Sequence, residues 1–304
     1  MRHVVTGGAI VVVGLAVWLW GMGGSDHILN WATAGQERVQ NAMAGYLQEL
    51  RSGNSAALVG LWGLCFAYGF FHAAGPGHGK LLIGGYGLGA QVPLTRLSLI
   101  AVISSLAQAA VAVALVYAGV FILGLSRTAM TDVSDRWLAP ASYAAIATVG
   151  MWLWLRGLRH WRQARKPHHH DHHDHHDHHD DHVCHTCGHS HAPDAEHVTQ
   201  ARTLRDMLVL IGAIAIRPCT GALFLLILTV QLGIGMAGVV GAFIMGLGTA
   251  SVTLAVAIAS VTLRDGLLAR LATSGRIPRA LPLVEMAAGA LVAIVSLQLM
   301  MRTL

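Results

Sequence analysis

Two histidines, His72 and His78, bracket the cluster Gly75-Pro76-Gly77 inside an otherwise apolar segment. Proline removes a backbone donor and clashes with the preceding helical turn, while glycine adds freedom to bend. The cluster therefore predicts a broken helix, whose bend would bring the two imidazole rings toward each other. Because imidazole binds nickel, cobalt, zinc and copper, we interpret both histidines as candidate metal ligands. The alternative for His72 is a hydrogen bond to a neighbouring carbonyl.

The same stretch contains Gly79-Lys80 and so has features of a phosphate-binding loop. That motif reads G-x-x-x-x-G-K followed by Ser or Thr. Ala74 and Leu81 occupy the first-glycine and hydroxyl positions, which excludes it. No activated nucleophile, paired carboxylates or cofactor fingerprint stands out elsewhere in the sequence. We therefore predict neither an enzyme nor a bound prosthetic group.

A second break is predicted at Pro218-Cys219. Cys219 is a candidate metal ligand, because thiolate binds the same transition metals as imidazole. The alternative is a small buried core residue, which free cysteines often are; this is what we expect of Cys65, in an unbroken apolar run. Lys80 and Arg217 stand beside the two breaks, and we expect them to bond exposed carbonyls or to reach a membrane interface.

The loop His168–His191 reads HHHDHHDHHDHHDDHVCHTCGHSH and contains thirteen histidines. Such a composition cannot build a packed core and is typical of metal binding. It predicts many weak, exchangeable sites plus one tighter site around its Cys-x-x-Cys pair; the alternative is a flexible polar tether. The residues predicted for the tighter site are Cys184, His185, Cys187, His189 and His191.

Composition places these residues in a membrane protein. Hydrophobic residues make up 54% of the 304 residues and charged residues 12%, against roughly 25% charged in a soluble domain. Seven apolar segments approach the roughly 20 residues that cross a bilayer. The second of them is too long to cross straight, so it must bend, tilt or re-enter. The segments are Val4–Trp20, Ala56–Gly89, Leu97–Leu125, Leu138–Leu158, Met207–Leu232, Met236–Leu263 and Pro282–Met301.

The two breaks belong to a repeat. Each proline is followed, at about the same distance, by a helix of small residues in which Gln108 and Thr249 occupy matching places. Each half contributes three spans, so the second copy must enter the membrane from the opposite side. Transporters with inverted repeats bind substrate at the midplane, where corresponding helices are interrupted. The residues predicted to line the pathway are Gly75, Pro76, Gly77, Pro218, Gln108 and Thr249; close helix packing is the alternative for the last two.

We predict an all-α polytopic membrane protein of about seven transmembrane helices, with an N-terminal anchor before a 3+3 inverted repeat whose first helices are broken by Gly and Pro. Lysine and arginine are concentrated on one side, which predicts a cytoplasmic His-rich loop and explains the basic pI without nucleic acid. The predicted divisions are residues 1–24 (anchor helix, alternatively a signal peptide), 25–54 (external amphipathic segment), 55–160 (repeat 1), 161–203 (cytoplasmic His-rich loop) and 204–304 (repeat 2).

The motif His72-Ala-Ala-Gly-Pro-Gly-His78-Gly-Lys80, the later Arg217-Pro-Cys-Thr-Gly-Ala-Leu and the histidine-rich loop between them resemble the NicO-type nickel/cobalt transporters. The resemblance covers roughly residues 55–304. It implies a multi-pass protein of the bacterial inner membrane that exports Ni²⁺ or Co²⁺. Efflux members carry an acidic residue where Gly75 stands and a histidine near the position of Gln108, so Zn²⁺ is kept as a further candidate substrate.

The sequence does not determine the direction of metal transport or the ion to which transport is coupled. Export of a dication from a negative interior costs about 4.6 kcal/mol per 100 mV, twice the single-charge value, so we expect coupling to inward protons. An importer that supplies a nickel or cobalt enzyme is one alternative, and a membrane metal sensor or chaperone is another. The lipid bilayer, the metal ions and protons are the expected partners, and the oligomeric state is left open.

Overall fold

The computed structural model describes residues 23–75, 78–90, 92–124, 126–164, 195–273 and 277–303, and these ranges are helical throughout apart from turns and short connections. The long apolar runs favour helices because a helix satisfies its backbone donors and acceptors within one segment. The helices are α2 (Gly24–Arg51), α3 (Ala57–Ala74), α4 (His78–Gly89), α5 (Leu94–Tyr117), α6 (Arg127–Val133), α7 (Ala139–Ala164), α8 (Ala195–Ala215), α9 (Thr220–Gln231), α10 (Gly235–Thr273) and α11 (Ile277–Met301), with π-helical turns Ala118–Ile122 and Ser134–Leu138.

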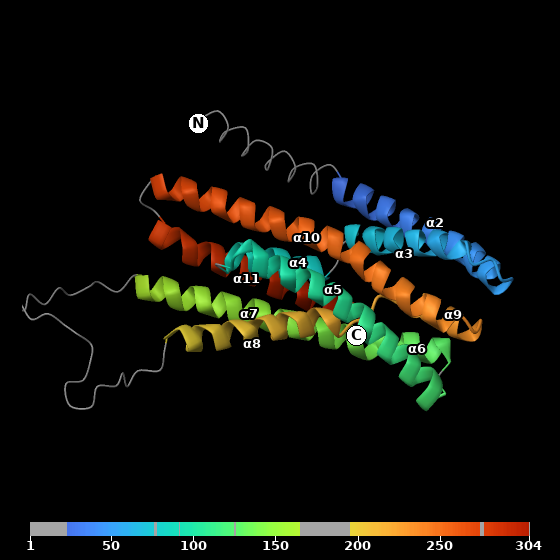
Figure 1. The fold of residues 1–304 in the computed structure, drawn as a ribbon. Helices are drawn as coiled ribbons and strands as arrows, with labels where there is room; N and C mark the ends of the chain where they lie inside the picture. Colours follow the sequence, from blue (N-terminus) through green and yellow to red (C-terminus); the bar gives the residue numbers. More distant parts are fainter. Residues whose placement is uncertain are drawn as a thin grey trace, which may run out of the picture.

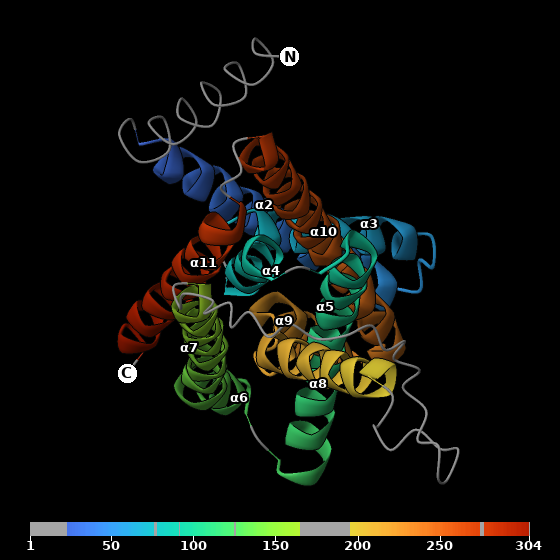
Figure 2. The same ribbon diagram turned by 90° about the vertical axis from the view of Figure 1, so that its left-hand side faces the viewer.

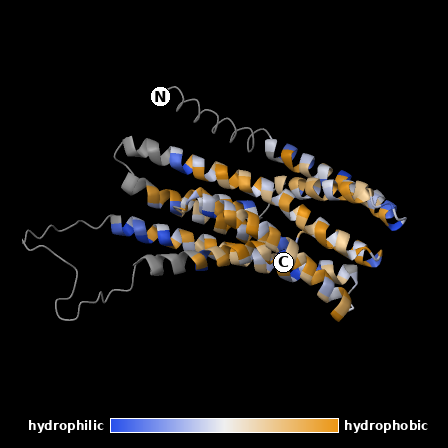
Figure 3. Ribbon diagram, viewed as in Figure 1, coloured by the Kyte–Doolittle hydropathy of each residue, from blue (hydrophilic) through white to orange (hydrophobic). Residues whose placement is uncertain are grey.

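Five helical segments are long and apolar enough to cross a membrane: Ala57–Ala74, Leu94–Ile122, Thr128–Gln163, Gly235–Gly266 and Leu281–Met301. A sixth span is formed if Leu204–Ala215 and Thr220–Gln231, which meet at an angle of 65°, are taken together. The chain is therefore a multi-pass membrane protein. Hydrophobic residues run along these helices, with hydrophilic residues toward the ends of several of them (Figure 3).

These segments match the predicted spans with one difference. The predicted span Ala56–Gly89 is two helices, α3 and α4, of which α3 alone has the length and hydropathy of a span. The predicted first span, Val4–Trp20, lies outside the described residues, as does most of the predicted loop 161–203. The count of seven helices and the inverted repeat stay predictions.

Two close helix crossings hold the bundle together. A Cβ at Gly150 of α7 would lie 2.9 Å from the Gly289 carbonyl oxygen of α11, and one at Gly69 of α3 would lie 1.9 Å from the Met245 carbonyl oxygen of α10. A Cβ at Gly248 would in turn meet the Phe66 carbonyl oxygen of α3 at 2.1 Å. Glycine is needed at these crossings because the backbones touch, as is usual where membrane helices pack through small residues.

The helix α2 is amphipathic and lies along α3 (Figure 1). Its buried side chains include Met43 and Leu47, and Met43 Sδ lies 3.9 Å from the Cys65 thiol of α3. Cys65 is fully buried, which confirms its predicted place in the core. The predicted amphipathic segment therefore packs on the bundle through α3.

The two broken helices run in opposite directions along the bundle (Figure 1). In the end-on view, α4 and α9 lie near the centre, while α7, α8, α10 and α11 surround them (Figure 2). The contacts agree, because α4 packs against α10 and α11, and α9 packs against α10 and α5. The short half-helices that follow the breaks are therefore central.

Candidate functional site

The first break follows the end of α3. Gly75 continues the chain with φ −64° and ψ 167°, a conformation open to any residue, so the turn at this position does not require glycine. The Lys80 ammonium of α4 reaches back and donates to the carbonyl oxygens of Ala74, at 3.2 Å, and of Gly75. This confirms the expectation that Lys80 bonds carbonyls freed by the break. Pro76 and Gly77 lie outside the described residues.

The second break separates α8 from α9. Cys219 is the N-cap of α9, with φ −69° and ψ 128°. The freed carbonyls of this break are satisfied from another helix: Gln108 Nε2 of α5 donates to the carbonyl oxygens of Ile214, at 3.0 Å, and of Arg217, at 3.4 Å. Gln108, which the sequence predicts at the pathway, thus serves as a cap for a helix of the other half of the chain.

The ends of the two broken helices meet at His72 and Cys219. Both side chains line the same cavity, and the Cys219 thiol lies 4.0 Å from Met245 Sδ of α10. The Tyr68 ring stacks on His72 with ring centroids 6.2 Å apart and 10° between planes. A Cβ at Gly221 would lie 2.1 Å from the Tyr68 ring, so glycine here makes room for the tyrosine. Two predicted ligands, distant in sequence, are therefore neighbours.

The orientation of the His72 ring is set from α2. His72 Nδ1 lies 3.3 Å from Gln36 Oε1. Because an amide oxygen only accepts hydrogen bonds, Nδ1 carries the hydrogen and Nε2 keeps the lone pair. A group that fixes the tautomer of a histidine in this way is typical of the outer shell of metal sites. His72 can therefore offer Nε2 to a thiol proton or to a metal ion.

These residues line a cavity of about 630 Å³. Its polar lining contains the hydroxyl groups of Ser104, Ser105, Thr249 and Thr253, and Ser105 Oγ lies 3.5 Å from Thr253 Oγ1. Thr249 also donates to the Gly69 carbonyl oxygen of α3 at 3.2 Å. The predicted pathway residues Pro218, Gln108 and Thr249 thus line one cavity together with His72, Cys219, Lys80 and Arg217.

Arg217 also lies at this cavity, but its contacts with Tyr143 and Asp135 are not the bonds to exposed carbonyls that are one of the two expectations for it. Its guanidinium donates to the Tyr143 hydroxyl, lies 5.3 Å from the centroid of the same ring and is 3.9 Å from Asp135 Oδ1. These contacts involve side chains rather than backbone carbonyls. Its partners come from α7 and from the π-helical turn before α7. The spacing of residues in the sequence does not predict that these elements lie near Arg217.

The structure leaves part of the predicted ligand set undescribed. His78 begins α4, but its side chain lies outside the described residues. The same is true of the loop ligands Cys184, His185, Cys187, His189 and His191. Among the described residues, no group of three or more His, Cys, Asp or Glu side chains gathers as a metal site would require. The described part of the breaks contributes a pair of candidate ligands, His72 and Cys219.

Sequence reasoning missed two neighbours of His72. Tyr68 precedes His72 by four residues, a spacing at which side chains of one helix are neighbours. The contact between these two rings could therefore have been predicted from the sequence. Gln36 lies on a different helix and carries no local signal.

A buried carboxylate lies between α7 and α11, away from the residues of the breaks. Glu285 is 3% exposed and pairs with Arg156 Nε at 2.9 Å and with His160 Nδ1 at 3.0 Å. These two contacts of Glu285 join α7 and α11, which pack closely along each other. A purely structural role explains these contacts.

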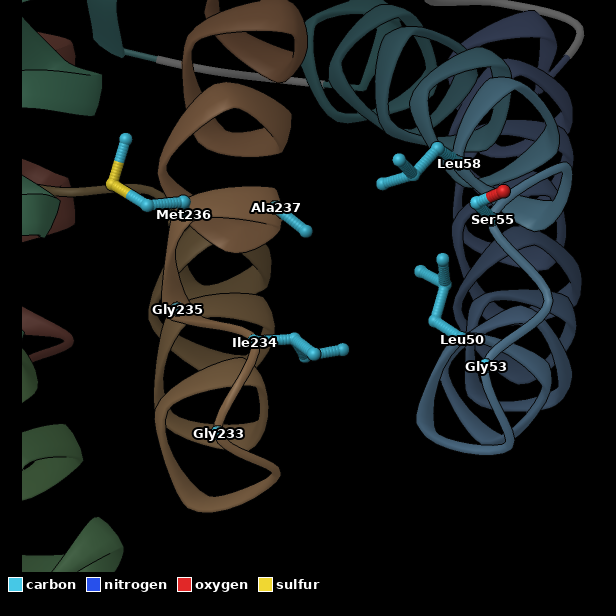
Figure 4. Close-up of a pocket in the computed structure, with 9 residues that line it drawn as sticks. All are labelled: Leu50, Gly53, Ser55, Leu58, Gly233, Ile234, Gly235, Met236 and Ala237. Atoms are coloured by element: carbon cyan, nitrogen blue, oxygen red, sulfur yellow. The ribbon is translucent and has the colours of Figure 1, made fainter.

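A second cavity, of about 410 Å³, lies between the α2–α3 connection and the α9–α10 connection (Figure 4). Leu50, Leu58, Ile234, Met236 and Ala237 make its lining mainly apolar. Its lining contains none of the candidate ligands, so it offers no metal chemistry.

The chain is similar to known proteins over most of its length. The model of the NicO family, described as "High-affinity nickel-transport protein", matches residues 58–183 and 166–304. A protein of Haemophilus influenzae, named "Putative nickel/cobalt efflux system", is 28% identical over 265 residues, which cover 82% of this chain and 79% of that protein. No solved structure matches.

Proposed function

Because the chain belongs to the NicO family of nickel and cobalt transporters, we propose that it exports Ni²⁺ or Co²⁺ from the cytoplasm through the cavity between its two broken helices. Membership of a transporter family excludes the enzyme class, as the sequence predicts. Export is the direction in the name of the Haemophilus influenzae relative. Zn²⁺ finds no support in these comparisons.

The observation that carries the proposal is the meeting of His72 and Cys219 at one cavity. Imidazole and thiolate are ligands that nickel and cobalt accept. The tautomer that Gln36 selects leaves Nε2 of His72 with its lone pair. A dication at this point would lie beside both breaks, and His78, at the start of α4, is the third candidate ligand.

An inverted repeat fits the way the two halves contact each other. Gln108, in the first half, caps the broken helix of the second half. Thr249, at the matching place in the second half, donates to α3, the broken helix of the first half. Each half thus donates a hydrogen bond to the broken helix of the other, an arrangement in which rocking of one half against the other would open the cavity to alternate sides.

Energy must come from a coupled process. Moving a dication out against a negative interior costs about 4.6 kcal/mol per 100 mV, and proton entry is the coupling we propose. Metal binding requires neutral imidazole and releases a thiol proton, so proton and metal would compete for the same ligands. In this scheme the protein lies in the bacterial inner membrane, and the His-rich loop captures metal ions on the cytoplasmic side.

Accumulation of ⁶³Ni and ⁵⁷Co in cells tests the proposal. We would compare a deletion strain with strains that carry wild type, Cys219→Ala or Cys65→Ala; the last removes a cysteine that lies in the core. Higher metal content in the deletion strain, corrected by wild type and Cys65→Ala but not by Cys219→Ala, is the expected result. Lower content in the deletion strain would indicate import, and equal content would point to the sensor or chaperone. Flux that ignores an imposed pH gradient would contradict proton coupling.

A further inference from the structure

Resting on this proposed function, we propose that Lys80 is a tethered cation that occupies the carbonyl end of α3 while the cavity holds no metal, and that a metal ion must displace it. Lys80 would then determine which ions enter, because only an ion that gains enough from imidazole and thiolate can compete with a covalently attached ammonium.

The contacts of Lys80 place its charge where a transported cation would be attracted. Its ammonium donates to the carbonyl oxygens of Ala74 and Gly75. These groups end α3, and the C-terminus of a helix carries a partial negative charge from its unpaired carbonyls. In interrupted membrane helices, such half-helix ends and unwound carbonyls are the groups that coordinate cations. In this structure a side chain of the protein already occupies them.

The position of Lys80 relative to the candidate ligands makes simultaneous occupancy unfavourable. Lys80, His72 and Cys219 line the same cavity. A dication held by His72 and Cys219 would repel an ammonium that stays on the adjacent carbonyls, because a site enclosed by protein screens charges less than water does. The long, flexible lysine stem allows the ammonium to move while the helix stays in place.

Arg217 offers a matched comparison in the same cavity. It carries the same charge and lines the same cavity as His72. Its contacts are with the Tyr143 hydroxyl and ring and with Asp135 rather than with the carbonyls of α3. Removal of either charge lowers the general repulsion of a dication, whereas loss of the Lys80 ammonium also frees the α3 carbonyls from a cation that a metal ion would have to displace. The two variants therefore separate a general charge effect from direct competition.

The experiment measures how Ni²⁺ protects Cys219 from alkylation in the purified full-length protein. N-ethylmaleimide is the reagent, and mass spectrometry of the Cys219 peptide distinguishes this thiol from those of the His-rich loop. Wild type, Lys80→Gln, Lys80→Met and Arg217→Gln are compared by the concentration of NiCl₂ that halves the alkylation rate. Lys80→Gln retains a neutral donor for the carbonyls, so it provides a folded variant if Lys80→Met does not fold.

Competition predicts that the half-protecting concentration falls at least about tenfold in Lys80→Met, since a whole charge leaves the site. It should fall somewhat less in Lys80→Gln and clearly less again in Arg217→Gln. Equal shifts in Lys80→Gln and Arg217→Gln would overturn the role of Lys80 and leave the proposed function standing, as would protection that is the same in wild type and both Lys80 variants. Absence of protection in all four proteins would overturn the metal site at the breaks, and the present inference with it.

Discussion

The two breaks of the membrane helices satisfy their freed carbonyls in different ways. At the first break the donor is a charged ammonium from the same half of the chain, Lys80. At the second break the donor is a neutral amide from the other half, Gln108. Both solve the same problem, since carbonyls without partners are costly inside a membrane.

The difference separates a replaceable contact from a fixed one. A cation on carbonyls can be exchanged for another cation, whereas an amide that donates to two carbonyls at once keeps two helices in register. The first break is therefore the one suited to respond to metal, and the second break is suited to anchor the Cys219 side of the cavity.

The largest effect is expected where the two breaks meet. His72→Ala and Cys219→Ala should each reduce export about 100-fold or more, because even the loss of an outer-shell group of a metal site costs 10–100-fold. The double variant should be no worse than either single variant, because both remove ligands of one site. Export of ⁶³Ni from loaded proteoliposomes measures this; additive losses would show that the residues act at separate places.

The next largest effect is expected on stability and export when a methyl group is added to a glycine at each break. Gly221→Ala places a Cβ 2.1 Å from the Tyr68 ring, whereas a Cβ at Gly75 meets nothing closer than 3.7 Å. We expect Gly221→Ala to destabilise the fold by about 1–3 kcal/mol through overpacking and to slow export by displacing Tyr68 from His72. Gly75→Ala is its control and should be close to neutral. Thermal unfolding in detergent, followed by circular dichroism, compares them, and equal losses would contradict the asymmetry.

A smaller effect is expected from removing the amide cap. Gln108→Leu keeps the approximate volume but leaves the Ile214 and Arg217 carbonyls without this donor, which costs about 1–2 kcal/mol for buried groups. Gln108→Glu should be at least as harmful, since a carboxylate cannot donate when ionised. The thermal unfolding midpoints of wild type and both variants, measured at the same detergent concentration, test this expectation. Full stability in both variants would show that the cap does not hold the second break.

The smallest effect is expected at the matching position. Thr249→Val removes the hydrogen bond to the Gly69 carbonyl oxygen, at 3.2 Å, and also the one within its own helix to the Met245 carbonyl oxygen. Both acceptors are main-chain groups of helices, so we expect a loss of about 0.5–1 kcal/mol. Thr249→Ser, which keeps the hydroxyl, is the control. A larger loss of stability in Thr249→Val than in Gln108→Leu would contradict the expectation that Gln108 makes the more important contact.

The positions of both breaks follow from local rules that a sequence displays. Proline and glycine end α3 before His78 and bend α8 against α9 at Pro218, and free carbonyls beside a lysine predict the contact that Lys80 makes. The apolar runs likewise predict the five spans and the bent sixth, apart from α4, which is too short to count as a span.

Partners across the bundle could not be predicted in the same way. Gln108 was expected at the pathway, but its acceptors on the second broken helix depend on how α5 packs against α8. Gln36 reaches His72 from a helix 36 positions earlier in the chain, and Arg217 finds an aromatic ring rather than a carbonyl. These choices depend on helix packing, for which residue spacing within one helix contains no information.

The anchoring of α4 has a consequence for how the protein is made. Arg264 of α10, which is 7% exposed, donates to the carbonyl oxygens of Gly87, at 3.2 Å, Ala90, at 2.7 Å, and Val92, at 3.0 Å. Its distance from Ala90 in the chain is 174 positions. A nascent chain that has not yet reached Arg264 lacks the donor that these three carbonyls have in the complete fold. The central half-helix of the first half therefore acquires its final partners only late in synthesis, when α10 has been inserted.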